Sequence, residues 1–228
     1  MIAQQSWANI GIVAGGGAVG TGLRYAISLS MPTPASVPLA ILGINVLGAF
    51  LLGVLLERLA RHGADDARSR RIRLGIGTGG LGGFTTYSAL ATETVTPWRR
   101  APRPRHRVRP WHRGHWRSRQ HRRYRTRSYA ESTARVVTRA AFSDLGTALL
   151  ICLAGGVGAA LRLVIDSLIR TRLKSTYPVG TAVINLTGSL LLGLLTGLTT
   201  GHLVPQQYQL IIGTGLLGGY TTFSAASV

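Results

Sequence analysis

Two stretches of this sequence place hydroxyl side chains directly after a run of glycines. They read GTGGLGGFTTYS from Gly77 to Ser88 and GTGLLGGYTTFS from Gly213 to Ser224. Glycine weakens a helix interior by about 1 kcal/mol relative to alanine, so each run predicts a helix break. Carbonyl groups freed by a break can bind a cation, and threonine or serine hydroxyls can line the path of a polar ion. Close packing through small residues is the alternative, but it does not require the Thr-Thr-aromatic-Ser sequel twice.

Four further polar side chains lie within or at the ends of apolar stretches. Asn45 and Asn185 are surrounded by apolar residues, and Arg24 and Arg162 stand near the ends of two other apolar stretches. A buried amide must be paired, so each asparagine either joins helices or donates in a pore. Each arginine either extends to a membrane surface or attracts anions into a vestibule.

The sequence gives little support for a disulfide framework, a metal or dinucleotide site, or a catalytic site. The lone Cys152 excludes a disulfide framework and a cysteine-based metal site. The pattern G-x-G-x-x-G occurs at 15–20, 77–82 and 213–218, but none of these follows a strand of a βαβ unit. No nucleophile–base pair or cluster of metal ligands is evident, so the chain is not expected to be an enzyme.

The elements that position these residues are long apolar spans. Each span is about 20 residues long, which is the length that crosses a bilayer as a helix. They run from about 10 to 29, 37 to 56, 74 to 95, 145 to 165, 179 to 199 and 210 to 228. Helices buried in a soluble core are the alternative, which the absence of any charge in 37–56 disfavours. The sequence predicts an all-α, polytopic membrane protein.

The spans repeat in threes. GGAVGTGLR (16–24) matches AGGVGAALR (154–162), and INVLGAFLLGVL (44–55) matches INLTGSLLLGLL (184–195). The two glycine-threonine stretches match in the same way, and the offsets are 138, 140 and 136 residues. We expect a first repeat at 1–97 and a second at 144–228, each with three transmembrane helices of which the third is broken.

The basic residues predict how the repeats face. Basic loops favour the cytoplasmic side of a membrane. In the first repeat they lie between the second and third spans, from Arg58 to Arg73; in the second they lie one loop earlier, at Arg170, Arg172 and Lys174. The repeats should therefore have inverted topology in the plasma membrane, with a cytoplasmic N-terminus and a binding site between the halves.

The segment 98–143 does not fit this pattern. Fifteen of the 26 lysines and arginines fall between Trp98 and Arg139. Three interpretations are open: an arm that binds RNA or anionic lipid, a disordered linker, or a stretch translated out of frame. We favour the third, because GC-rich genes read in a shifted frame yield Arg, Pro, His and Trp. An apolar span near Pro97 in another frame of the gene would identify it.

The combination of G-x-x-x-R, N-x-x-G and G-G-x-T-T-aromatic-S in successive spans resembles the Fluc/CrcB fluoride channels, over about 80 residues in each repeat. This resemblance implies passive fluoride export through paired pores of antiparallel subunits, around a structural sodium ion. It implies that main-chain carbonyls of Gly82, Thr85, Gly218 and Thr221 hold the sodium. The implied fluoride pathway comprises Asn45, Thr86, Tyr87, Ser88, Asn185, Thr222, Phe223 and Ser224, and the arginines Arg24 and Arg162 would form the vestibule.

The chain departs from the family pattern in two ways. Neither repeat has a recognisable fourth helix, and the second pathway phenylalanine is replaced by Leu90 and Ala226. The expected partners are fluoride, lipid and either another copy or the second repeat as an intrachain pseudo-dimer, with no nucleic acid. The alternative to a fluoride channel is a nonfunctional or regulatory membrane scaffold with a basic, anion-binding arm. A small-molecule transporter is less favoured, because the short spans suggest no substrate-sized cavity.

Overall fold

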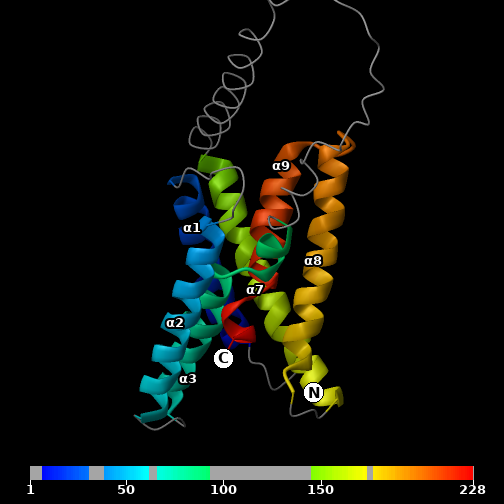
Figure 1. The fold of residues 1–228 in the computed structure, drawn as a ribbon. Coiled ribbons are helices and arrows are strands. Elements are labelled where there is room, and N and C mark those ends of the chain that lie inside the picture. The colour runs from blue at the N-terminus through cyan, green and yellow to red at the C-terminus, as the bar shows by residue number, and fades with distance from the viewer. Residues whose placement is uncertain (1–6, 31–38, 62–65, 93–144, 174–176, 228) are drawn as a thin grey trace, which may run out of the picture.

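The computed structural model describes residues 7–30, 39–61, 66–92, 145–173 and 177–227, which are mostly helical and include no strand (Figure 1). The long apolar helices are α1 (Trp7–Ser30), α2 (Leu39–Arg61), α7 (Leu145–Leu173) and α8 (Val179–Thr200). Each is long and apolar enough to cross a bilayer. The predicted all-α, polytopic membrane fold is confirmed, whereas the segment 98–143 lies outside the described residues.

The third span of each repeat is built from short helices in series. In the first repeat α3 (Ala67–Ile72), η2 (Arg73–Leu81) and α4 (Gly82–Phe84) follow one another without a gap, and helix resumes over 87–92. In the second, α9 (Gln206–Tyr208), η3 (Gln209–Leu217) and α10 (Gly218–Tyr220) are followed by a 3₁₀ turn, η4 (Ser224–Ala226).

The break in each third span falls on the threonine pair, after the glycine run. Thr85 and Thr221 adopt extended backbone, with φ −91° and ψ 150° in one and φ −84° and ψ 156° in the other. The glycine runs themselves stay helical but form wide π turns, in which the Gly82 N–H donates to Gly77 O and the Gly218 N–H to Gly213 O. Such turns are rare and concentrate at functional sites.

The glycines also allow the third span to lie directly against the first. A Cβ added to Gly20 would lie 2.0 Å from Gly80 O, and one added to Gly158 would lie 2.1 Å from Leu216 O. These distances leave no room for a side chain. Close packing through small residues and a broken helix therefore coexist in this sequence.

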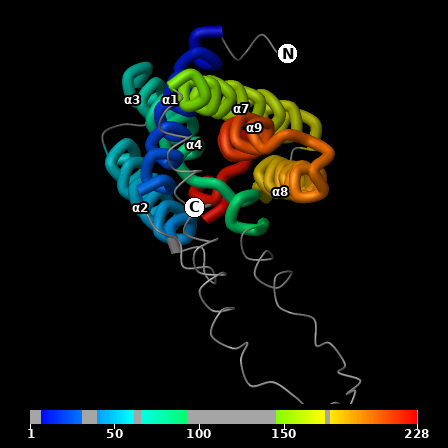
Figure 2. The backbone as a smooth tube through the Cα atoms, turned by 90° about the horizontal axis from the view of Figure 1, so that it is seen from above, coloured from blue at the N-terminus to red at the C-terminus, as the bar shows by residue number. Residues whose placement is uncertain are grey.

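The two halves meet along α1 and α7, which cross in antiparallel directions. A Cβ on Gly17 would lie 2.4 Å from Ala159 Cβ, and one on Gly22 would lie 2.9 Å from Cys152 Sγ, so residue numbers rise on α1 as they fall on α7. Gly17 and Gly155 occupy equivalent places in the two repeats and contact each other at the crossing. Viewed from above, α1 and α2 lie on one side and α8 on the other, with α4 and the C-terminal residues between (Figure 2).

Candidate functional site

A cluster of hydroxyl side chains forms where the two breaks meet. Its members are at most 1% exposed and come in equal numbers from the two repeats. They are Thr85, Thr86, Ser88, Thr221, Thr222 and Ser224. We call this group the hydroxyl cluster. It lies at the centre of the molecule because the extended threonine backbone of each half turns inward beside the other.

Thr221 is the acceptor at one side of the hydroxyl cluster. Its hydroxyl donates to Leu217 O at 3.0 Å, as threonine does within a helix. The same oxygen lies 3.1 Å from Thr86 Oγ1 and 2.9 Å from Ser88 Oγ, and it accepts from the Ser88 N–H at 3.3 Å. Residues of the first repeat therefore converge on a hydroxyl of the second.

Thr85 plays the equivalent part at the other side. Its hydroxyl donates to Leu81 O at 3.0 Å. Its oxygen lies 3.3 Å from Thr222 Oγ1 and 3.0 Å from Ser224 Oγ, and it accepts from the Ser224 N–H at 3.2 Å. The cluster thus has approximate two-fold symmetry, with each half supplying donors to the other.

Counting protons shows what the hydroxyl cluster can do. A hydroxyl has one proton and two acceptor lone pairs. The Thr221 proton is used on Leu217 O, so its two lone pairs face three donors: the Thr86 hydroxyl, the Ser88 hydroxyl and the Ser88 N–H. The Thr85 oxygen likewise faces three donors: the Thr222 hydroxyl, the Ser224 hydroxyl and the Ser224 N–H. The third donor has a longer alternative acceptor, because Thr86 Oγ1 lies 3.3 Å from Ser88 Oγ and Thr222 Oγ1 lies 3.4 Å from Ser224 Oγ. One hydroxyl bond on each side can therefore be exchanged for a bond to an anion, and no carboxylate belongs to the cluster to repel it.

Asn45 and Asn185 hydrogen-bond the break in each third span to the second helix of the same repeat. The Asn45 amide donates to Thr86 O at 2.9 Å and accepts from the Thr86 N–H at 2.9 Å. Asn185 makes the same pair of bonds with Thr222, at 2.8 Å and 2.9 Å. Each amide satisfies a main-chain donor and acceptor that the break releases from the helix. Their expected role as fluoride donors stays a prediction.

Arg24 and Arg162 are buried, at 2% and 5% exposure, and hydrogen-bond to glycine-run carbonyls. Arg24 Nε donates to Gly83 O at 3.2 Å, and its Nη2 donates to Thr214 O of the other repeat at 2.8 Å. Arg162 reaches across in the opposite direction, donating to Gly82 O at 3.1 Å and to Thr78 O. The two guanidinium groups therefore join the halves, and neither extends to the membrane surface.

Two of the expected sodium ligands, Gly82 and Gly218, lie close to these guanidinium groups. Gly82 O already accepts from the Arg162 guanidinium, and a Cβ on Gly218 would lie 2.4 Å from Arg24 Nη2. A cation at either glycine carbonyl would lie beside a fixed positive charge in a buried environment, which is unfavourable. The sodium ion and its expected ligands Gly82, Thr85, Gly218 and Thr221 stay a prediction.

The aromatic residues of the motif occupy different environments. Tyr87 is 41% exposed, and Phe223 is half-buried. The preceding aromatics are packed instead: Phe84 is buried beside Gly48, and the Tyr220 hydroxyl lies 3.1 Å from Thr187 Oγ1. The roles of Tyr87 and Phe223 as pathway residues stay predictions.

Two polar residues near the site were not anticipated. Thr21 is fully buried on α1, and its hydroxyl lies 3.4 Å from Gly83 O. Asp166 lies one turn after Arg162 on α7, and its Oδ2 accepts from Arg170 Nε at 2.8 Å. The spacing of acid and arginines along α7 was visible in the sequence, but nothing in it showed that this helix face borders the site.

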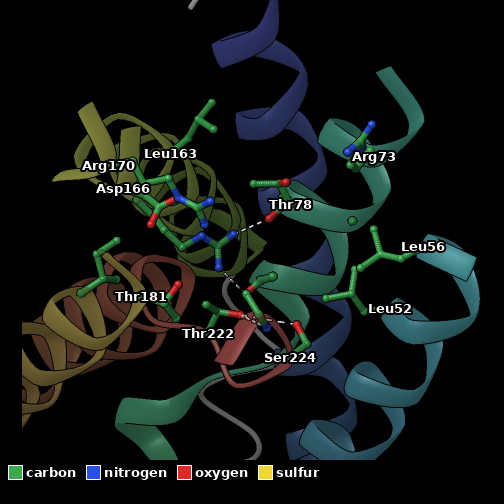
Figure 3. A pocket seen from close by; sticks show the side chains of 15 residues that line it. Leu52, Leu56, Arg73, Thr78, Leu163, Asp166, Arg170, Thr181, Thr222 and Ser224 are labelled. Carbon is green, nitrogen blue, oxygen red and sulfur yellow. Dashed lines mark hydrogen bonds and ion pairs between the residues drawn. The ribbon is translucent and has the colours of Figure 1, made fainter. Parts of the chain in front are cut away.

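A cavity of about 390 Å³ leads from the outer face of the molecule to the hydroxyl cluster. Arg73, Thr78, Arg162, Asp166, Arg170, Thr181, Thr222 and Ser224 contribute its polar lining. Figure 3 shows Thr222 and Ser224 together on one side and Asp166 beside Arg170 on another. Because Arg73 and Arg170 line one cavity, the arginine-rich parts of the two repeats lie at the same end of the molecule.

Comparisons with known proteins agree with the repeats. The family described as CrcB-like protein, Camphor Resistance (CrcB), matches residues 11–106 and 149–228, which is more than half of the chain. Fluoride-specific ion channel FluC 1 of Leifsonia xyli subsp. xyli is 52% identical over 79 residues, or 35% of this chain and 58% of that protein.

Two other relatives have similar names. Fluoride-specific ion channel FluC 2 of Cutibacterium acnes is 52% identical over 83 residues, or 36% of this chain and 68% of the relative. FluC 2 of Mycobacterium bovis is 45% identical over 74 residues, or 32% of this chain and 56% of the relative. The chain thus spans little more than half the length of several of these relatives. No solved structure matches it.

Proposed function

Because the chain belongs to the CrcB-like family, we propose that it is a fluoride-selective channel that lets fluoride leave the cell passively and so lowers its cytoplasmic concentration. The family consists of ion channels rather than enzymes, and relatives that share about half of the aligned residues are named fluoride-specific channels. The long apolar helices make the chain a multi-pass membrane protein.

The observation that carries this proposal is the competition among hydrogen-bond donors in the hydroxyl cluster. Fluoride is small and strongly hydrated, so a pore must replace its water with hydrogen-bond donors. In each half three donors, two hydroxyls and an N–H, surround an oxygen that accepts only two. A hydroxyl that turns from this oxygen to a passing fluoride gives up one of several competing bonds, so binding and release both stay easy.

The conduction path that we propose uses residues of this chain only. Fluoride enters from the cavity, where Thr222 and Ser224 are the hydroxyl donors of the cluster that reach the lining. It then passes to the donors on the far side, Thr86 and Ser88, which lie within hydrogen-bond distance of Thr221. Asn45 and Asn185 hold the two breaks in the shape that makes this sequence of donors possible.

The membrane arrangement belongs to the same proposal. The antiparallel crossing of α1 and α7 supports inverted repeats that act as an intrachain pseudo-dimer. The arginine-rich end, which carries Arg73 and Arg170, would face the cytoplasm of a plasma membrane. Since α1 runs against α7, its first residue lies at this end too, which agrees with a cytoplasmic N-terminus.

The structural sodium ion stays a prediction from the resemblance, and no step of the proposed conduction uses it. Its presence can be measured by melting purified protein in sodium chloride and in choline chloride at equal ionic strength. A higher melting temperature that is specific to sodium would support an ion bound by main-chain oxygens at the breaks. Equal melting temperatures would show that no sodium is needed.

Fluoride efflux from liposomes tests the proposed function. Purified full-length protein is reconstituted into vesicles loaded with potassium fluoride, and efflux is followed with a fluoride electrode after a potassium ionophore is added. We expect fluoride release well above that of empty vesicles. Release equal to that of empty vesicles would contradict the channel and favour the membrane scaffold.

A further inference from the structure

The cavity that leads to the hydroxyl cluster is unusual in its charge. Arg73 and Arg170 are exposed at its mouth, whereas Arg162 is buried deeper. Asp166 is the acidic residue among its lining side chains. The lining therefore carries three positive charges and one negative charge, next to a cluster that is rich in hydrogen-bond donors.

Asp166 stands between two of these arginines on α7. It lies four residues after Arg162 and four before Arg170, so all three side chains share one helix face. Its Oδ2 accepts from Arg170 Nε at 2.8 Å. Its Oδ1 is buried against Gly180 of α8, where an added Cβ would lie 2.2 Å away, and has no hydrogen-bond partner among the described residues.

The first repeat carries different residues at the equivalent places. The repeat offsets pair Arg162 with Arg24, but they pair Asp166 with Ser28 and Arg73 with Gln209. Gln209 is engaged with the second helix of its own repeat, since its Oε1 accepts from the Thr199 hydroxyl at 2.9 Å. The concentration of charge around the cavity is thus a feature of one end of the molecule, although the hydroxyl cluster itself is symmetric.

We propose that this cavity is the anion entrance at the arginine-rich end, and that Asp166 limits the positive potential inside it. Three guanidinium groups without an acid would hold an anion too firmly, and conduction requires binding that is weak enough for release. Asp166 offsets part of this charge and keeps Arg170 at the mouth. The identity of the anion as fluoride rests on the proposed function, whereas the potential of the cavity does not.

A reporter cysteine measures this potential without any ion flux. Ala225 is exposed and lines the cavity, so cysteine at this position can be reached by thiol reagents. The native Cys152 is first replaced by alanine, the residue that Ala14 supplies at the equivalent place of the first repeat. Rates are then compared for an anionic sulfonate and a cationic trimethylammonium methanethiosulfonate, each divided by its rate with a free thiol.

In this background we expect the anionic reagent to be favoured over the cationic one. Asp166→Asn should raise the anionic-to-cationic rate ratio by about 3- to 10-fold, as expected for loss of one unit charge within a Debye length. Asp166→Ser, which copies the residue of the first repeat, should do the same. Arg170→Gln should lower the ratio by a similar factor.

The pair Glu57–Arg61 provides a matched control. It also joins an acid and an arginine four residues apart at 2.8 Å, near the same end of the molecule but outside the cavity lining. Glu57→Gln and Arg61→Gln should change the ratio less than twofold. The proposal is overturned if Asp166→Asn changes the ratio no more than Glu57→Gln does, or if the cysteine at 225 reacts with neither reagent.

These outcomes are separate from those of the efflux assay. Vesicles that release no fluoride would contradict the proposed function, yet the reagent ratio would still report whether the cavity collects anions. Conversely, normal fluoride release with an unchanged reagent ratio in Asp166→Asn would support the channel function and contradict the proposed role of Asp166.

Discussion

Single polar groups decide whether the two breaks can exist in a membrane. A break exposes main-chain donors and acceptors that lipid cannot satisfy. Asn45 and Asn185 meet this need by pairing with both main-chain groups of Thr86 and Thr222. The hydroxyls of the cluster therefore do not have to satisfy these main-chain groups, and their hydrogen bonds to one another can be exchanged for bonds to an ion.

Replacing either asparagine should therefore destabilise the protein. Asn45→Leu leaves a buried N–H and a buried C=O of Thr86 without partners, at a cost of about 1–3 kcal/mol for each group. The melting temperature should fall, and Asn185→Leu should lower it by a similar amount. Gln207→Leu, which removes an exposed amide, is the control. Equal melting temperatures for Asn45→Leu and Gln207→Leu would argue against this role.

Removing a hydroxyl donor of the cluster should instead affect conduction. In Ser88→Ala and Ser224→Ala the acceptors Thr221 and Thr85 keep other donors, so stability should change little. A hydrogen bond to a charged group contributes about 1.5–3 kcal/mol, so fluoride flux should fall about tenfold or more. Thr171→Ala, which removes an exposed hydroxyl on α7, should leave flux unchanged. Wild-type flux in both serine variants would exclude the cluster from the pathway.

The sequence motif predicted that hydroxyl side chains line a polar path, but it did not predict the surroundings of the arginines. Arg24 and Arg162 were expected at a vestibule, which stays a prediction; both bind main-chain carbonyls, and Arg162 also lines the cavity. One of those carbonyls, Thr214 O, is 190 residues from Arg24 in the chain. No local pattern can show such a contact, because it arises only when the halves pack together.

At the scale of elements, the third span of each repeat takes its shape from its contact with the first span of the same repeat, α1 or α7. The apolar lengths and the repeat pattern predicted the helices, and the glycine runs predicted an interruption. The structure places the extended residues after the glycines, at Thr85 and Thr221, and converts the runs into π turns. Main-chain atoms of the neighbouring helix fix this shape, so propensity alone does not reveal it.

Glycine-to-alanine changes along α1 should separate the effect of helix packing from that of helix propensity. A Cβ at position 20 would lie 2.0 Å from Gly80 O, so Gly20→Ala must push the third span away and disrupt folding. Gly15→Ala meets no atom within 4 Å and should be neutral or stabilising by up to about 1 kcal/mol. The yield of monodisperse protein in detergent and its melting temperature provide the comparison. Similar values for the two variants would contradict the packing described here.

At the scale of the whole molecule, the central question is whether the two repeats are paired as α1 and α7 indicate. A disulfide can answer it, because a Cβ at Gly22 would lie 2.9 Å from the sulfur of the native Cys152. This separation suits a disulfide between helices of different repeats. Gly22→Cys should therefore oxidise to a crosslink, whereas Gly11→Cys, with no atom within 4 Å, should not.

The crosslink is read after cleavage at a protease site inserted between the repeats. Halves that stay together on a non-reducing gel and separate on a reducing gel are the expected result for Gly22→Cys. Equal crosslinking of Gly22→Cys and Gly11→Cys would show that the crossing of α1 and α7 is not fixed.

The most direct test of the account is the selectivity of ion release from vesicles. Full-length protein is reconstituted into vesicles that contain equal concentrations of fluoride and chloride, and both ions are followed with selective electrodes. The account predicts rapid fluoride release, chloride release no faster than from empty vesicles, and loss of fluoride release in the double variant Ser88→Ala/Ser224→Ala. Equal release of the two ions, or fluoride release that persists in the double variant, would contradict a fluoride pathway through the hydroxyl cluster.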